Sequence, residues 1–321
     1  MKPTSFTKIA DNLSDNEHRE IAEKLAIHKI DGIELSIAGG RWGATWDTNK
    51  DYDLNFLKFY KGIKVIRIFL HGVRDIKPIL HLADTLENLQ LGEFKDKKIS
   101  FAFFADLPNL KSLSIVKQSK GLESIVRLPK LTELALTGYS VDKLSFLNKL
   151  QSLRQLYIGF GTSKNIDTIS QLENLEELDI LWVKQLADIN AISKLTSLIK
   201  LKIENGKQIK TLPDFSQLKG LKNIRLMNIS TLEDISSLTN SYVDEFIITG
   251  PNKNTDILIP IANIYCVKKV YTYFYLKKEQ VKAEQLLGNK FCPLSKMEFE
   301  MTHLKQVSLH YYDIKTGDKI E

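Results

Sequence analysis

The sequence predicts an elongated α/β solenoid made of short parallel strands. Apolar hexads of the pattern L-x-x-L-x-L recur along most of the chain, and from Leu86 to Val243 there are 157 residues in seven steps, about 22 per repeat. Of the 321 residues, 43% are hydrophobic, which is enough to bury a large core and excludes general disorder. A repeat architecture of this kind overrides the two-domain expectation that length alone would give.

Each hexad predicts one short strand. The last two apolar residues alternate with polar ones, so both point to the same side of a strand. One such unit cannot bury its apolar side alone, whereas stacked units bury a continuous core. A period of about 22 residues leaves room only for 3₁₀ or single-turn segments between strands. The hexads begin at Ile63, Leu86, Leu110, Leu131, Leu153, Leu175, Leu198, Leu221 and, as a looser copy, Val243.

These hexads resemble the leucine-rich repeat family, in its short type of about 22 residues found in bacterial internalins and in a eukaryotic phosphatase regulator. The resemblance covers roughly residues 60 to 275. It implies a leucine-rich repeat horseshoe with a parallel β-sheet on the concave face and short 3₁₀ or turn segments on the convex side. The sequence departs from the family where an asparagine usually follows the strand, since Trp182 and Val183 follow Ile180.

A helical cap is expected at the N-terminal end, in residues 1–60, because the end of a solenoid needs cover. Ser14 and Glu17 have the spacing of a capping box, and apolar residues then follow at helical spacing to about His28. Ile30 begins an isolated first hexad. A glycine- and tryptophan-rich insert follows and contains Arg41, Trp42 and Trp46. It is interpreted as part of the cap, with an exposed binding loop as the alternative.

The repeats are assigned to residues 61–275 and a mixed C-terminal cap to residues 276–321. Lys277 to Leu287 is expected to form a helix that stops at Gly288. A last strand is predicted at residues 304–309, and a further strand with a closing turn at residues 311–318. No linker separates these parts, so the chain is treated as one elongated domain.

The charge balance gives little support for a nucleic-acid or membrane partner. The chain has 45 basic and 39 acidic residues, a net charge of +6, without a block of like charges. No apolar run approaches the ~20 residues of a membrane-spanning helix. Two cysteines, Cys266 and Cys292, exclude a disulfide framework. With no signal peptide visible, the expectation is a cytoplasmic protein, and the composition suggests a bacterial one.

No catalytic, cofactor or metal site is predicted. None of the histidines has zinc-ligand spacing, and no nucleophile motif is present. Glu177 and Asp179 lie two apart on one strand, as a pair of glycosidase acids would. Lys200 and Lys202 occupy the equivalent positions one repeat later, so a charge ladder across the strands is the simpler interpretation.

The outward positions between the leucines line the concave face, which is the usual binding surface of solenoids. Charge there runs from acidic to basic, and aromatic residues lie on the rim just past two strands. Aromatic residues and arginine are enriched at binding hot spots. The candidate contact residues are Arg67, Phe69, Tyr157, Phe160, Glu177, Asp179, Trp182, Lys200, Lys202, Arg225, Tyr271 and Tyr273.

The sequence therefore favours a non-enzymatic, monomeric protein-interaction module that binds a protein partner on its concave face. An immunity or inhibitor protein and a regulatory adaptor are the sharper hypotheses. An internalin-like surface or secreted binding protein is the first alternative, and a carbohydrate-active enzyme is the second.

Overall fold

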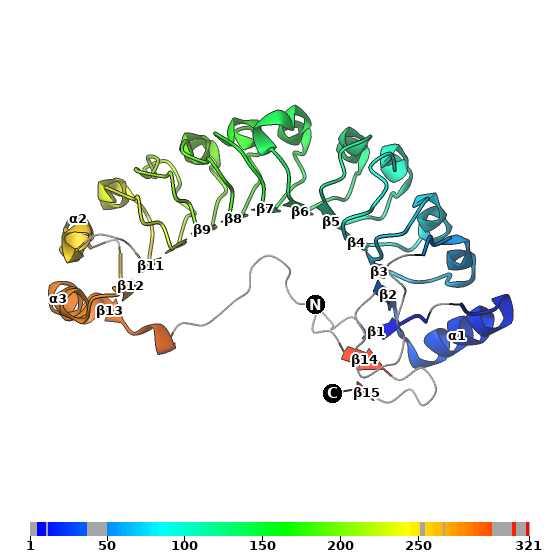
Figure 1. Cartoon of the computed structure of the whole chain (residues 1–321). Coiled ribbons are helices and arrows are strands. Elements are labelled where there is room, and N and C mark those ends of the chain that lie inside the picture. Colours follow the sequence, from blue (N-terminus) through cyan, green and yellow to red (C-terminus); the bar gives the residue numbers. More distant parts are fainter. Residues whose placement is uncertain are drawn as a thin grey trace. The chain divides into compact units, whose positions relative to one another are not determined.

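The computed structural model describes residues 5–10, 12–36, 50–250, 254–265, 267–296, 310–312 and 319–320. The chain divides into two compact units. Unit 1 contains Met1–Leu134 and Leu304–Glu321, and unit 2 contains Ala135–His303. Each unit is a stack of short strands joined mostly by 3₁₀ turns. Figure 1 shows that in each unit the strands lie on one side and the 3₁₀ turns on the other.

Unit 1 begins with a strand that the sequence did not predict, β1, and continues with the capping helix. Helix α1 begins after Ser14, whose side chain accepts a hydrogen bond from the Glu17 amide, while the Glu17 carboxylate accepts one from the Ser14 amide. Both bonds satisfy amides that the first turn of a helix leaves unpaired. The predicted capping box and the helix end at His28 are thus confirmed. The elements are β1 (Ser5–Lys8), α1 (Asp15–His28), β2 (Gly32–Ser36), β3 (Val65–Phe69), β4 (Asn88–Leu91) and β5 (Ser112–Val116).

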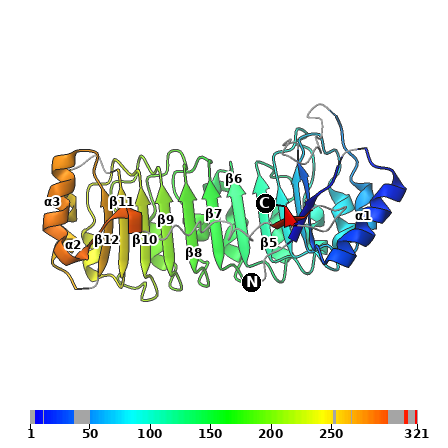
Figure 2. The same ribbon diagram turned by 90° about the horizontal axis from the view of Figure 1, so that it is seen from below.

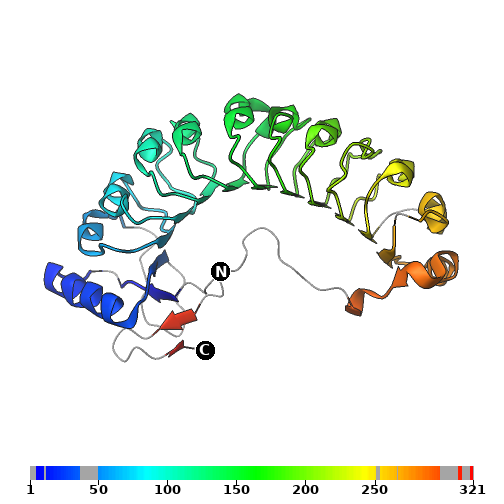
Figure 3. The same ribbon diagram turned by 180° about the vertical axis from the view of Figure 1, so that it is seen from behind.

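The C-terminal segment returns to unit 1. Strand β14 (His310–Tyr312) pairs in parallel with β1, and β15 (Lys319–Ile320) pairs antiparallel with β14 (Figure 3). This differs from the assignment of residues 276–321 to one C-terminal cap. The physical reason is that β1 ends the stack with an open row of backbone donors and acceptors, which β14 covers. The strand predicted at residues 304–309 lies outside the described residues.

Unit 2 carries the longest regular run of repeats. Its strands pair in parallel with each neighbour from β7 to β13, and Figure 2 shows β7 to β12 side by side. Strand β6 contains the division between the units. The strands are β6 (Glu133–Thr137), β7 (Gln155–Gly159), β8 (Glu177–Leu181), β9 (Lys200–Glu204), β10 (Asn223–Met227), β11 (Glu245–Thr249), β12 (Lys269–Tyr273) and β13 (Phe291–Cys292).

Two helices lie among the last strands of unit 2: α2 (Ile259–Ala262) between β11 and β12, and α3 (Lys277–Leu287) between β12 and β13. Helix α3 covers the end of the stack, and Glu279 anchors it. The buried Glu279 carboxylate accepts hydrogen bonds from the amide and hydroxyl of Thr255 at 2.9 and 3.0 Å. The predicted bounds of this helix and its stop at Gly288 are confirmed.

The apolar positions of the hexads form the core of both units. In the hexad of β8, Leu175 and Leu178 are fully buried and Ile180 is 1% exposed, and the other hexads behave in the same way. The connections between strands are mostly 3₁₀ turns, for example Asn190–Lys194. The predicted solenoid of parallel strands and short turns is therefore confirmed.

Stacking continues in the repeats that lack an asparagine beyond the strand, such as those of β7 and β8. Backbone groups take over, as the Lys184 amide donates to Gly161 O at 2.9 Å and the Ser163 amide donates to Lys184 O at 3.0 Å. In unit 1, the Gln118 side chain donates to Asp96 O at 2.8 Å and serves the same purpose. Main-chain hydrogen bonds between turns thus keep the repeats in register.

Among the described residues, no helix has the length and apolar character needed to cross a membrane.

Candidate functional site

The strand face of unit 2 is formed by the side chains of β7 to β12 that point away from the 3₁₀ turns. Its charged residues are in register across neighbouring strands: Glu177 lies beside Lys200, and Asp179 beside Lys202. The Lys200 Nζ atom is 3.6 Å from Glu177 Oε1. This is the predicted charge ladder, in which each carboxylate has a lysine in register one repeat away.

The ladder continues toward the C-terminal repeats. Lys202 Nζ is 3.6 Å from Glu204 Oε2. One repeat further, Arg225 Nε donates to Asn223 Oδ1 at 3.2 Å, and Asn223 Nδ2 donates to Glu245 Oε1 at 2.7 Å. The strand face therefore carries several sets of paired polar groups, whose fixed charges can select a partner with matching charges.

Some predicted contact residues are nearly covered. Tyr157, Asp179 and Tyr271 occupy the central row of the strand face and are 8%, 7% and 6% exposed. Strands about 4.8 Å apart bring neighbouring side chains close enough to cover this row. Burial raises the pKa of Tyr157 to about 12, and the carboxylates of Asp179 and Glu204 add to this effect. The phenol is thus neutral at pH 7.

Two large aromatic residues remain exposed at the edge where the strands end. Phe160 directly follows β7 and is 56% exposed, and Trp182 directly follows β8 and is 50% exposed. We call these two residues the rim pair. They lie one repeat apart, and Phe160 N donates to Leu181 O at 2.9 Å. The rim pair borders the acidic end of the strand face.

Both residues of the rim pair have a left-handed backbone, with φ of 55° at Phe160 and 53° at Trp182. The next repeats have Asn205, Asn228 and Gly250 at the equivalent position, also with positive φ. Asparagine and glycine adopt this conformation readily, whereas a bulky residue is an outlier there. The turn geometry requires the left-handed backbone at this position, but it does not require an aromatic residue.

Other predicted contact residues are spread over the molecule. Tyr273 ends β12, is 47% exposed and packs edge-on against Tyr275 at 5.7 Å between ring centroids. Arg67 and Phe69 belong to unit 1. The Arg67 guanidinium bonds to Glu34 at 2.9 Å and to Gln90 at 3.0 Å, and it lies over the Phe69 ring. Arg67 is therefore already engaged within its own unit.

The second predicted surface, Arg41, Trp42 and Trp46, lies outside the described residues.

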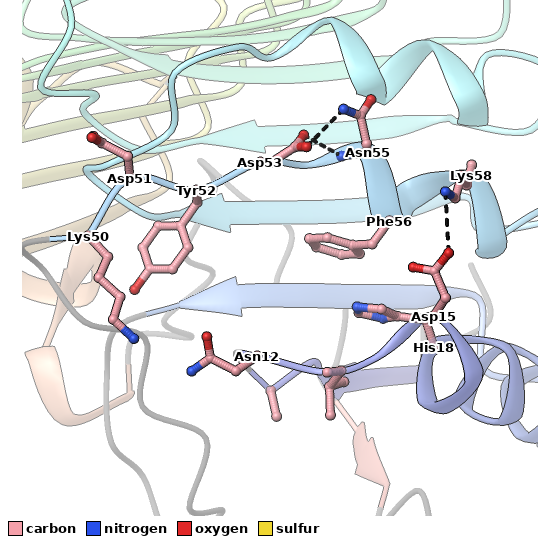
Figure 4. Close-up of a pocket in the computed structure, with 12 residues that line it drawn as sticks. Asn12, Asp15, His18, Lys50, Asp51, Tyr52, Asp53, Asn55, Phe56 and Lys58 are labelled. Carbon is pink, nitrogen blue, oxygen red and sulfur yellow. Dashed lines mark hydrogen bonds and ion pairs between the residues drawn. The ribbon is translucent and has the colours of Figure 1, made fainter.

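A polar pocket of about 400 Å³, which no sequence pattern indicated, lies in unit 1 between α1 and residues 50–58 (Figure 4). His18 forms part of its wall, stacked on Phe56 with ring centroids 4.6 Å apart. Lys58 Nζ lies 3.6 Å from Asp15 Oδ2, and both residues line the pocket. His18 has the spacing of a core position on the helix, but its partners come from a distant segment, so local pattern alone does not reveal the pocket.

Burial lowers the pKa of His18, while the nearby carboxylates of Asp15 and Glu17 act in the opposite direction. Its Nδ1 atom lies 2.7 Å from the buried Tyr60 hydroxyl. Within the described part of the chain, no cluster of histidine, cysteine and carboxylate side chains has the arrangement of a metal site.

Solved structures with a similar fold include an internalin from Listeria monocytogenes. The match has a TM-score of 0.51 at 15% identity and covers 89% of this chain and 95% of the internalin chain. This chain has the leucine-rich repeat fold. A leucine-rich repeat protein from Leptospira interrogans matches with a TM-score of 0.48 and 15% identity, over 83% of this chain and 72% of that one. At these identities the likeness concerns the fold alone.

No protein-family model matches the sequence, and no curated protein matches it.

Proposed function

We propose that this leucine-rich repeat protein is a protein-interaction module that binds a protein partner on the strand face and rim pair of unit 2. The observation that carries the proposal is the rim pair, two half-exposed aromatic rings beside a charged strand face. Large aromatic residues supply most of the energy at protein interfaces, and surrounding charges give specificity. A surface that merely kept the sheet soluble would not need exposed phenylalanine and tryptophan.

A dedicated inhibitor, such as an immunity protein, is the sharper form of this proposal. The fixed charge ladder and the rim pair support it, because a rigid and specific surface favours one tight partner. A regulatory adaptor would instead bind several proteins weakly. An internalin-like surface or secreted binding protein is the second candidate, and the fold shared with an internalin favours it.

The first experiment is a pull-down from a lysate of the native cell, with the bound proteins identified by mass spectrometry. The wild-type chain is compared with the double variant Phe160→Asn, Trp182→Asn. The matched control is Ile259→Asn, which changes another hydrophobic residue that is 56% exposed, but in α2, away from the strand face. We expect one stoichiometric protein that the control retains and the double variant loses. A partner retained equally by all three proteins would contradict the proposed surface.

The number of bound partners and their resistance to washing distinguish an inhibitor from an adaptor. A single partner that stays bound through extended washing supports an inhibitor, whereas several partners lost on washing support an adaptor. Recovery of the partner only from the culture medium or the cell surface would support the internalin-like alternative.

A further inference from the structure

The turn after each strand constrains the backbone but not the residue type. From β5 to β11 the residue that directly follows each strand has positive φ, and outside the rim pair these residues are Lys117, Gly138, Asn205, Asn228 and Gly250. A left-handed backbone is strained for a bulky residue. Asparagine or glycine would form this turn with less backbone strain. We therefore infer that the aromatic rings of the rim pair have a role other than forming the turn.

The hydroxyl of Tyr157 lies close to the rim pair. Its hydroxyl lies over Gly159, where an added Cβ would come within 2.2 Å of it, and Gly159 directly precedes Phe160. Both Asp179 and Glu204 act electrostatically on this hydroxyl. Glu204 is the last residue of β9, whereas Asp179 is the middle residue of β8, three residues before Trp182.

Glu204 is the more accessible of the two carboxylates. Its side chain is 22% exposed, whereas Asp179 is buried. Glu204 is in register with Leu181, the residue before Trp182, and the Trp182 amide donates to Glu204 O at 3.0 Å. Trp182 and Glu204 are thus neighbours at the ends of two adjacent strands.

The charges at this position are mixed. Asp179 and Glu204 contribute two negative charges, and Lys202 and Arg225, which are in register with each other, contribute two positive charges. Lys200 and Glu177 form a separate ion pair. Glu204 is the carboxylate next to Trp182 along the sheet, and a positively charged group complements it.

We propose that the rim pair and Glu204 together bind an arginine side chain of the protein partner. A guanidinium is flat, so it stacks on an exposed aromatic ring while its N–H groups bond to a carboxylate. The buried Asp179 carboxylate adds negative charge nearby. The Glu204 carboxylate interacts with both Lys202 and the incoming arginine. This inference rests on the proposed function for the existence of the partner, but not for the chemistry of the surface.

Two synthetic peptides test the chemistry without the natural partner. One is acetyl-Gly-Arg-Gly-Arg-Gly-amide, and the other has citrulline, a neutral isostere, in place of both arginines. The reporter is the indole Nε1–H signal of Trp182 in the ¹H–¹⁵N spectrum of the full chain, assigned by its loss in Trp182→Phe. We expect a saturable shift with the arginine peptide and at least tenfold weaker binding of the citrulline peptide.

Variants test the contribution of each group. Glu204→Gln should weaken the arginine peptide about fivefold to tenfold, since it removes the charge while keeping the shape. Glu233→Gln is the matched control, because Glu233 is exposed and lies in the turn region after β10, outside the strand face, and it should leave the affinity unchanged. Phe160→Asn should weaken binding while leaving the Glu204 contact in place.

Equal binding of the two peptides, no saturable shift at Trp182, or no effect of Glu204→Gln would overturn the inference. These failures differ from failure of the proposed function. If the arginine peptide binds as expected but the pull-down finds no protein, the proposed function fails. If a partner is found but the peptide results are negative, only the arginine inference fails.

Discussion

At the scale of single residues, the left-handed turn position separates what the fold requires from what binding requires. Phe160 and Trp182 have φ near 55°, and both side chains are half exposed. The sequence could show that aromatic residues lie past two strands. It could not show the strain, because other repeats have glycine, asparagine or lysine at the same position and φ is not visible in a hexad pattern.

Phe160→Asn should be more stable than Phe160→Ala by about 0.5–1 kcal/mol. Both variants remove the ring, but only asparagine adopts the left-handed backbone at low cost. Urea denaturation of the two variants measures the difference. The matched control is Ile199, which is 40% exposed and is not among the positive-φ residues. There asparagine should have no advantage over alanine, and an equal advantage at both sites would contradict the explanation.

At the scale of elements, the register of β8 and β9 was predictable because the repeat length places equivalent positions side by side. The Glu177 and Lys200 pairing follows directly from that counting. The near-complete burial of Tyr157 and Asp179 was not predictable, since it depends on how tightly neighbouring strands cover the central row. Strand β1 was missed because its four residues carry no apolar hexad, and because one of its two partners, β14, lies about 300 residues away in sequence.

Reversing the ladder pair tests the register. Lys200→Glu places two like charges side by side, and we expect a loss of about 0.5–1 kcal/mol in the free energy of unfolding. The double variant Glu177→Lys, Lys200→Glu restores an opposite pair and should recover most of that loss. Measurement at low ionic strength avoids screening. The single variant Glu177→Lys is measured as well. If the losses in unfolding free energy of Lys200→Glu and Glu177→Lys simply add in the double variant, the proposed pairing is wrong.

The cap helix gives a prediction for pH. Burial lowers the pKa of His18, so between that lowered pKa and the unfolded value of about 6.5 the unfolded chain binds more protons than the folded one. The contribution of His18 is therefore fully present above pH ~6.5 and is lost as the pH falls through this window. Unfolding free energy should decrease on acidification from pH 7 to pH 5, and less steeply in His18→Gln.

The carboxylate of Glu17 does not confuse this measurement, because its pKa is lowered by hydrogen bonds from Ser14 and it titrates below the window. An NMR titration of the His18 ring supplies a direct check. A titration midpoint above pH 6.5 would contradict the lowered pKa of His18 and the loss of stability on acidification that follows from it.

At the scale of the whole molecule, the repeat pattern predicts the fold because every turn adds the same buried positions. Leu178 has no exposed surface in the middle of unit 2. Leu178→Asp should cost at least ~4 kcal/mol, since it buries an unpaired charge between stacked repeats. Circular dichroism on heating measures the loss. Glu177→Gln, at the neighbouring outward position, is the control and should melt close to wild type, and a normal melting curve for Leu178→Asp would contradict the repeat register.

Function was less accessible from the sequence than fold. The hexads specify the buried half of each repeat, whereas the partner depends on side chains that the fold leaves free to vary. Charge order and rim aromatics pointed to unit 2, and the structure adds which of these side chains remain exposed. The pocket beside His18 required a contact between segments that no local pattern reveals.

We propose that the strand face and rim pair of unit 2 hold the protein partner. The most direct test is the dissociation constant of the purified partner for the wild-type chain, the Phe160→Asn, Trp182→Asn variant and the Ile259→Asn control, by isothermal titration calorimetry. We predict a loss of at least a hundredfold for the double variant and no change for the control, as expected for two hot-spot residues. Dissociation constants within twofold of one another for all three proteins would contradict the claim.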